Sequence, residues 1–124
     1  MSDDASRLAD GQALDRAALD KLASDMEDES FALAFARRYQ QLLERRVSRI
    51  ESALEDADLD RAMDALLSLK VSSTTAGTRE LMRLATDMEA DVRTMDLGSA
   101  RRRADGLRDA AARADRALAA YLRV

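Results

Sequence analysis

The absence of proline from all 124 residues is the feature that most constrains the fold, because no residue in the chain is barred from the interior of a helix. Only four glycines are present, whereas β-sandwiches and barrels need frequent tight turns that rely on glycine and proline. Alanine, leucine, arginine and aspartate are the most abundant residues, and the first three favour helix. Apolar residues make up 47% of the chain, which is sufficient for a core. The sequence therefore predicts an all-α fold, and its length fits one domain.

Apolar residues recur with helical spacing through most of the chain. Residues 1–13 are polar and acidic, so we expect a flexible acidic N-terminus ahead of a single domain over residues 14–124. A short amphipathic helix is predicted next, with a face formed by Leu14, Ala18, Leu19 and Leu22. The longest helix is expected from about residue 29 to 55, with a stripe formed by Phe31, Phe35, Leu42, Val47, Ile50 and Leu54, beside Ala34, Tyr39, Leu43 and Ala53.

Three more helices are predicted after Asp56–Asp60, a segment that offers several N-cap side chains. The first of them has a core face formed by Met63, Leu66, Leu69 and Ser73. A joint at Ala76–Thr78 leads to the next, whose core face is formed by Leu81, Leu84, Ala85, Met88 and Val92. A turn at Met95–Ser99, with Asp96 or Ser99 as the cap, precedes a last helix from Ala100 to Tyr121. Short joints favour antiparallel neighbours, so we expect an up-down four-helix bundle with an additional short N-terminal helix.

Several kinds of chemistry are excluded by the residues that are missing. The sequence has no histidine and no cysteine, which removes the commonest general base and the commonest zinc ligands. The spacing of Asp56, Asp58 and Asp60 resembles the start of a calcium loop, but Arg61 and Leu67 occupy the positions that need glycine and glutamate. No glycine-rich phosphate loop and no convergent set of acid, base and nucleophile is visible. We therefore expect no enzyme activity, no metal and no cofactor.

The charges also argue against two classes of partner. The net charge is −4, with nine acids and three bases from Asp3 to Glu29, and seven arginines and three aspartates from Ser99 to Val124. Aspartates alternate with the arginines of this basic end, and two tyrosines and two phenylalanines are too few for a base-stacking surface. No apolar run approaches the roughly 18 residues of a membrane span, and the N-terminus is acidic rather than a basic signal region. We expect a cytoplasmic protein that binds no nucleic acid and no membrane.

The third predicted helix and the joint after it contain the most informative pattern. The run Ala65-Leu66-Leu67-Ser68-Leu69-Lys70-Val71-Ser72-Ser73 is followed by Ala76-Gly77-Thr78 and then by Leu81. This pattern resembles the histidine-containing phosphotransfer (HPt) domain family, whose motif is approximately Ala-His-x-Leu-Lys-Gly-Ser-(Ser/Ala), followed by a Gly-Ala/Thr joint and a leucine. The resemblance implies the family's five-helix arrangement, in which a short N-terminal helix accompanies a four-helix bundle.

Two departures from the family motif change what the resemblance implies. Leu67 stands at the place of the phospho-accepting histidine, and Val71 replaces the small glycine one helical turn later. A leucine side chain has no nucleophilic or basic atom, so phosphoryl relay cannot occur at Leu67. The resemblance thus implies a degenerate, or pseudo-, phosphotransfer domain. In the family the histidine face docks the receiver domain of a response regulator or the catalytic part of a sensor kinase.

Helical spacing places Leu67, Lys70, Val71 and Thr74 on one face, rotated by about 100° from the predicted core face. One interpretation is an apolar docking patch with a cationic rim, which binds the partner together with adjoining residues of the long helix. The other is that Leu67 and Val71 widen the core stripe or are lone exposed residues. Exposure of Leu67 separates the two.

The sequence therefore predicts a non-catalytic binding module of two-component or phosphorelay signalling, with a receiver domain or sensor histidine kinase as its partner. The partner-binding residues would be Leu67, Lys70, Val71 and Thr74. The alternative is a structural or protein-interaction bundle unrelated to phosphorelay, for which an alanine-rich helix offers a surface for dimerisation. The sequence leaves the oligomeric state open.

Overall fold

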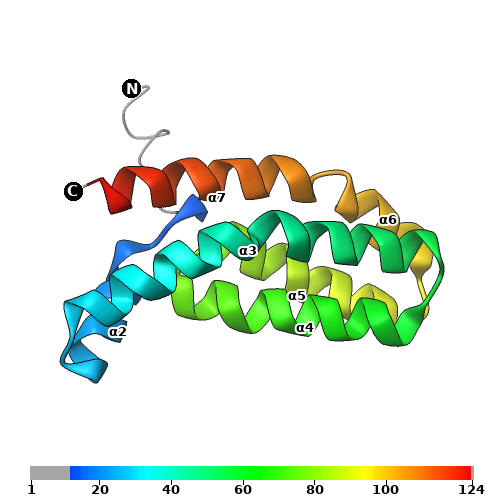
Figure 1. Cartoon of the computed structure of the whole chain (residues 1–124). Coiled ribbons are helices and arrows are strands. Elements are labelled where there is room, and N and C mark those ends of the chain that lie inside the picture. The colour runs from blue at the N-terminus through cyan, green and yellow to red at the C-terminus, as the bar shows by residue number, and fades with distance from the viewer. Residues whose placement is uncertain (1–11, 124) are drawn as a thin grey trace.

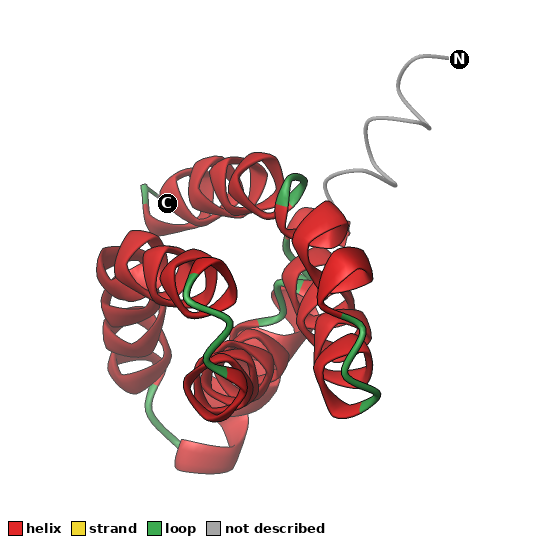
Figure 2. Ribbon diagram, turned by 90° about the vertical axis from the view of Figure 1, so that its right-hand side faces the viewer, coloured by secondary structure: helices red, strands yellow, loops and turns green. Residues whose placement is uncertain are grey.

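The computed structural model describes residues 12–123, and within them every regular element is an α-helix (Figures 1 and 2). The predicted all-α class is confirmed. Of the predicted flexible segment 1–13, residues 1–11 lie outside the described residues. The helices are α2 (Arg16–Met26), α3 (Glu29–Glu55), α4 (Leu59–Ala76), α5 (Arg79–Arg93), α6 (Leu97–Ala104) and α7 (Leu107–Leu122).

The bundle itself is formed by α3, α4, α5 and α7, which run side by side along the molecule (Figure 1). The short helix α2 packs on α3 and α4 at the end where α4 turns into α5. At the opposite end, α6 connects α5 to α7 and packs mainly on α5. This matches the predicted up-down bundle with a short N-terminal helix.

Aspartates in the joints begin the helices, as the sequence predicted. The side chain of Asp58 accepts a hydrogen bond from the backbone N–H of Arg61 at 3.1 Å, and caps α4. Asp96 caps α6 in the same way, with 3.0 Å to the N–H of Ser99. Each cap satisfies a backbone donor that the helix itself leaves free, and its charge complements the helix dipole.

The prediction of one continuous helix from Ala100 to Tyr121 is wrong, because the chain breaks between α6 and α7 at Asp105 and Gly106. There the N–H groups of Asp105 and Gly106 bond to the carbonyls three residues earlier, at 3.3 and 3.1 Å, instead of four. Glycine is a poor helix former, and it weakens the helix at this point. The break lets α6 reach the end of α3, where Arg101 donates two hydrogen bonds, 3.2 and 2.8 Å long, to the carbonyl of Leu54.

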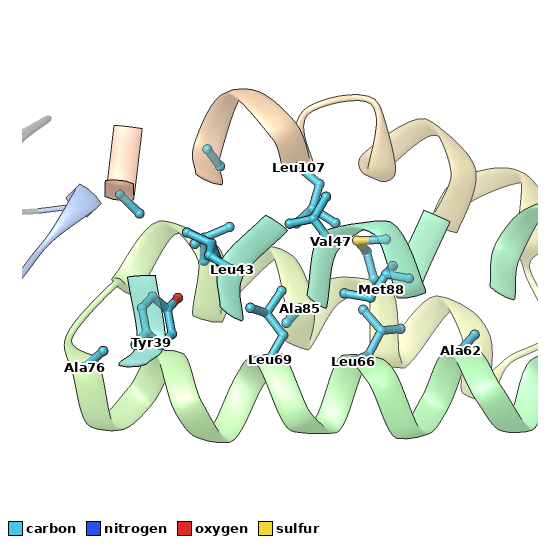
Figure 3. Close-up of a cluster of buried hydrophobic side chains, with 14 of the residues drawn as sticks. Tyr39, Leu43, Val47, Ala62, Leu66, Leu69, Ala76, Ala85, Met88 and Leu107 are labelled. Atoms are coloured by element: carbon cyan, nitrogen blue, oxygen red, sulfur yellow. The ribbon is translucent and has the colours of Figure 1, made fainter. Parts of the chain in front are cut away.

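The core lies between the four long helices and is formed by the predicted apolar stripes of α4 and α5, by α7 and by the middle of α3 (Figure 3). The stripe of α3 differs from the prediction in its first turns, where Ala32 and Ala36 are buried and Phe31 is 42% exposed. These alanines allow α2 to pack closely on α3, which leaves Phe31 on the outer side. No helix within residues 12–123 is long and apolar enough to cross a membrane.

Gly77 fixes the joint between α4 and α5 against the start of α2. Its φ of +85° is a left-handed conformation that favours glycine, and a Cβ there would lie 2.4 Å from the carbonyl oxygen of Asp15. The backbone N–H of Asp15 donates to the carbonyl of Gly77 at 2.7 Å, and the Asp15 carboxylate pairs with Arg79. The C-terminal end of α4 is thus held in place by α2.

Candidate docking face on helix α4

Leu67 and Val71 lie on the outer face of α4, one helical turn apart, and are 39% and 64% exposed. The residues that the sequence assigned to the core face are Leu66, Leu69 and Ser73, which are fully buried, and Met63, which is partly buried. Leu67 therefore does not widen the core stripe. It is an exposed apolar side chain near the middle of a bundle helix, on a well-packed support.

Lys70 lies beside this apolar pair and is bound to α5. Its ammonium Nζ donates a hydrogen bond to Oε2 of Glu89 at 3.0 Å, and Arg93 pairs with the other carboxylate oxygen. The Glu89 side chain is 7% exposed, whereas that of Lys70 is 36% exposed. The Lys70 ammonium thus faces solvent on one side while its charge is largely neutralised by a buried carboxylate.

The hydrogen bond from Lys70 lowers the pKa of the Glu89 carboxyl below its ordinary value. Burial acts in the opposite direction, and the positive charges of Lys70 and Arg93 reinforce the lowering. Glu89 is therefore an anion at neutral pH, and it is held between two cations. Sequence reasoning missed Glu89, although its position four residues after Ala85 placed it on the buried side of α5.

Thr74 completes the predicted set and is exposed, but its hydroxyl is engaged within α4. The Thr74 Oγ1 donates to the carbonyl of Lys70 at 2.8 Å, and Thr75 Oγ1 donates to that of Val71 at 3.3 Å. Each hydroxyl thus donates to a backbone carbonyl, which is not a base that could activate it as a nucleophile. Within residues 12–123 no three Asp or Glu side chains are grouped so that they could hold a metal ion.

A buried polar network supports the face from below. The hydroxyl of Tyr39 on α3 lies 2.7 Å from the hydroxyls of both Ser73 on α4 and Thr78 at the start of α5. Burial raises the pKa of the Tyr39 hydroxyl, and the guanidinium of Arg46 lies over its ring at 5.8 Å. The network ties three helices together at one level. Ser73 on a predicted core face and Tyr39 beside the predicted stripe of the long helix were the signals for it in the sequence.

The two edges of the face are different. On one edge, Lys70 contacts α5 through Glu89. On the other, Ala65 and Ser68 line a small surface pocket together with Arg49 of α3. Leu67 and Val71 lie between these edges, so α5 as well as the long helix α3 borders the predicted docking residues.

Comparison with known proteins agrees with the fold. No protein-family model matches the sequence, and no curated protein matches it. Among solved structures, the chain is similar to the HPt domain of an Hpt sensor hybrid histidine kinase from Shewanella, with a TM-score of 0.74. The match covers 90% of this chain and 95% of that domain, at 18% sequence identity. At this identity the likeness shows an HPt-like fold.

Proposed function

We propose that this protein is a non-catalytic relative of phosphotransfer domains, which binds a receiver domain or a sensor histidine kinase through the α4 face and accepts no phosphoryl group. The single observation that carries the proposal is the exposure of Leu67 at the motif position where the HPt family has its histidine. The HPt-like fold supports it, because an equivalent face is then presented at an equivalent place on the bundle.

The chemistry of the face fits binding rather than group transfer. Leu67 and Val71 offer apolar contact area, and removing such area from water on docking is favourable. Lys70 adds a partly exposed cation at the edge, which suits the polar rim that surrounds the apolar centre of a typical interface. With no histidine in the chain, the face lacks the phosphoryl acceptor of the HPt family, and the nearby threonine hydroxyls are bonded to backbone carbonyls.

The alternative of a dimer formed through the alanine-rich helix receives less support. Ala110 and Ala114 of α7 are buried in the core of this chain, where they allow α7 to pack closely on its neighbours. These two alanines therefore already have a packing role in the monomer, whereas Ala112 and Ala120 of the same helix are exposed.

The test is the affinity of the variant Leu67→Asp for receiver and kinase domains from the source organism, purified one by one. A charge at the centre of a desolvated interface should weaken binding by about 30- to 1000-fold, or about 2–4 kcal/mol. The free energy of unfolding should stay within about 0.5 kcal/mol of the wild-type value, because Leu67 is exposed. Isothermal titration calorimetry and circular dichroism measure the two quantities.

Met95→Asp is the matched control, since Met95 is also an exposed apolar residue, 74% exposed, but lies at the turn between α5 and α6. It should bind like the wild type. The proposal is wrong if no receiver or kinase domain binds the wild-type chain, or if Leu67→Asp and Met95→Asp bind equally well. Unfolding of Leu67→Asp at a much lower temperature would also contradict it, because that result identifies Leu67 as a core residue.

A further inference from the structure

Arginines without an acidic partner are concentrated on α3. Elsewhere in residues 12–123 most cations form ion pairs, as do Lys21, Arg61, Lys70, Arg79, Arg93, Arg103, Arg108 and Arg113. On α3, by contrast, Arg38, Arg45 and Arg49 are exposed on one side of the helix and have no acid within ion-pair distance among the described residues, as is also true of Arg37 on another side. We call Arg38, Arg45 and Arg49 the arginine strip.

The strip occupies one side of the helix. Arg45 and Arg49 are four residues apart, and Arg38 precedes Arg45 by seven, so all three project from the same face. Like charges at a spacing of four destabilise a helix slightly, by about 0.2–0.5 kcal/mol. No ion pair offsets this repulsion among the described residues, although Asp64 lines the same surface pocket as Arg49.

Arg46, next to the strip, indicates the same uncompensated positive charge. Its Nη1 is buried and has no hydrogen-bond partner among the described residues. Burial lowers the pKa of the Arg46 guanidinium, the interaction with Tyr39 opposes this, and the charges of Arg38 and Arg49 lower it further. Arg38 and Arg49 are therefore close enough to Arg46 for their charges to act on it.

The strip adjoins the α4 face. Arg49 and Ser68 line the same surface pocket, and Ser68 precedes Val71 by three residues, one turn along α4. A partner that covers Leu67 and Val71 and extends toward α3 would therefore meet Arg49 first and the rest of the strip beyond it.

We infer that the arginine strip is the electrostatic half of the docking surface, and that the partner is a protein domain with a carboxylate-rich surface beside an apolar centre. This inference rests on the proposed function, and it adds the chemistry of the partner. Complementary charges outside the apolar centre mainly raise the association rate. A protein partner is favoured over nucleic acid because the adjoining residues are the aliphatic Leu67 and Val71, with no aromatic ring on the face to stack on a base.

The first experiment needs no partner protein and uses poly-L-glutamate as a probe of acidic surface. The isotope-labelled full chain is titrated with it at low ionic strength and followed by NMR. We expect the resonances of α3 around the strip to shift most. The triple variant Arg38→Gln/Arg45→Gln/Arg49→Gln should bind poly-L-glutamate at least about tenfold more weakly than the wild type. The matched control is Arg37→Gln/Arg83→Gln/Arg116→Gln, which removes the same charge from exposed arginines outside the strip and should bind like the wild type.

Equal weakening by the two triple variants would overturn the inference, as would a footprint centred on α6 and α7. Vesicles rich in phosphatidylglycerol and a single-stranded RNA oligonucleotide serve as competing probes at the same ionic strength. The assignment to a protein surface would be overturned if either probe bound the wild-type chain more tightly than poly-L-glutamate does and the strip variant no longer bound that probe.

The second experiment uses a receiver or kinase domain that binds the wild-type chain. The strip variant should associate at least about tenfold more slowly at low salt, and the difference should vanish near 1 M salt, where the screening length is about 3 Å. An unchanged association rate in the strip variant, together with lost binding in Leu67→Asp, would refute the inference and leave the proposed function intact. If the proposed function alone is wrong, no receiver or kinase domain will bind the wild-type chain. The poly-L-glutamate titration still tests whether the arginine strip binds an acidic surface.

Discussion

Leu67 and Lys70 lie nearly one turn apart on α4, and their side chains have different surroundings. Leu67 is an exposed apolar side chain. Lys70 is held by Glu89, a carboxylate on the buried side of α5, which fixes the ammonium at the edge of the face. Holding the cation in advance reduces the conformational entropy that docking would otherwise cost. The ion pair is thus part of the face even though Glu89 itself is buried.

Replacing Glu89 by glutamine tests this ion pair. Because the pKa of Glu89 is lowered in the folded protein, its stabilising effect is present above the ordinary carboxyl pKa of about 4.3 and is lost as the pH falls through the lower folded value. Glu89→Gln should therefore reduce the free energy of unfolding by about 1–2 kcal/mol at pH 7. Urea denaturation at neutral and at acidic pH should show that the difference shrinks below pH of about 4.

Glu44→Gln is the control, since Glu44 is exposed and forms no ion pair among the described residues. It should change the free energy of unfolding by less than about 0.5 kcal/mol at either pH. A Glu89→Gln deficit that is the same at acidic and neutral pH would show that Glu89 contributes through packing and not through its charge.

Elements with a strong apolar period and a clear cap were predictable, and weaker ones were not. The bounds of α3 and the start of α4 follow from Asp28, Asp58 and the long stripe between them. The separation of α6 from α7 was missed because alanines on both sides of Gly106 continue the helical period, and the bend depends on the contact of Arg101 with the end of α3. On α4 the shared face of Leu67 and Val71 was predictable from helical spacing, but the sequence left its exposure open, and the ion pair with Glu89 depends on how α4 and α5 pack.

Gly77 is the residue on which the attachment of α2 depends most. Gly77→Ala should destabilise the protein, because alanine is strained at a φ of +85° and its Cβ would collide with the Asp15 carbonyl. We expect a loss of about 1–3 kcal/mol, and faster hydrogen exchange in α2 than in the remaining helices. Gly98→Ala is the matched control, since a Cβ there meets the flexible end of Arg102 at 3.4 Å and a side-chain oxygen of Asp96 at 3.7 Å, and no backbone atom. Equal exchange rates of α2 in the two variants would contradict this role of Gly77.

At the scale of the whole molecule, the bundle presents the α4 face on a rigid support. Tyr39, Ser73 and Thr78 connect α3, α4 and α5 beneath it, and α2 holds the C-terminal end of α4 through the Gly77 joint. The apolar pair lies on the outer surface of α4, between a neutralised lysine toward α5 and the arginine strip on α3. A partner that docks on α4 would therefore contact three neighbouring helices and leave α7 uncovered.

Docking through the α4 face is tested most directly by mapping a bound receiver or kinase domain on the isotope-labelled chain by NMR. We expect the amide resonances of residues 63–75 to shift or broaden most, with weaker changes in the adjoining parts of α3 and α5. The outer side of α7 should be unaffected. A footprint centred on α7, or changes spread evenly over all helices, would contradict docking at Leu67.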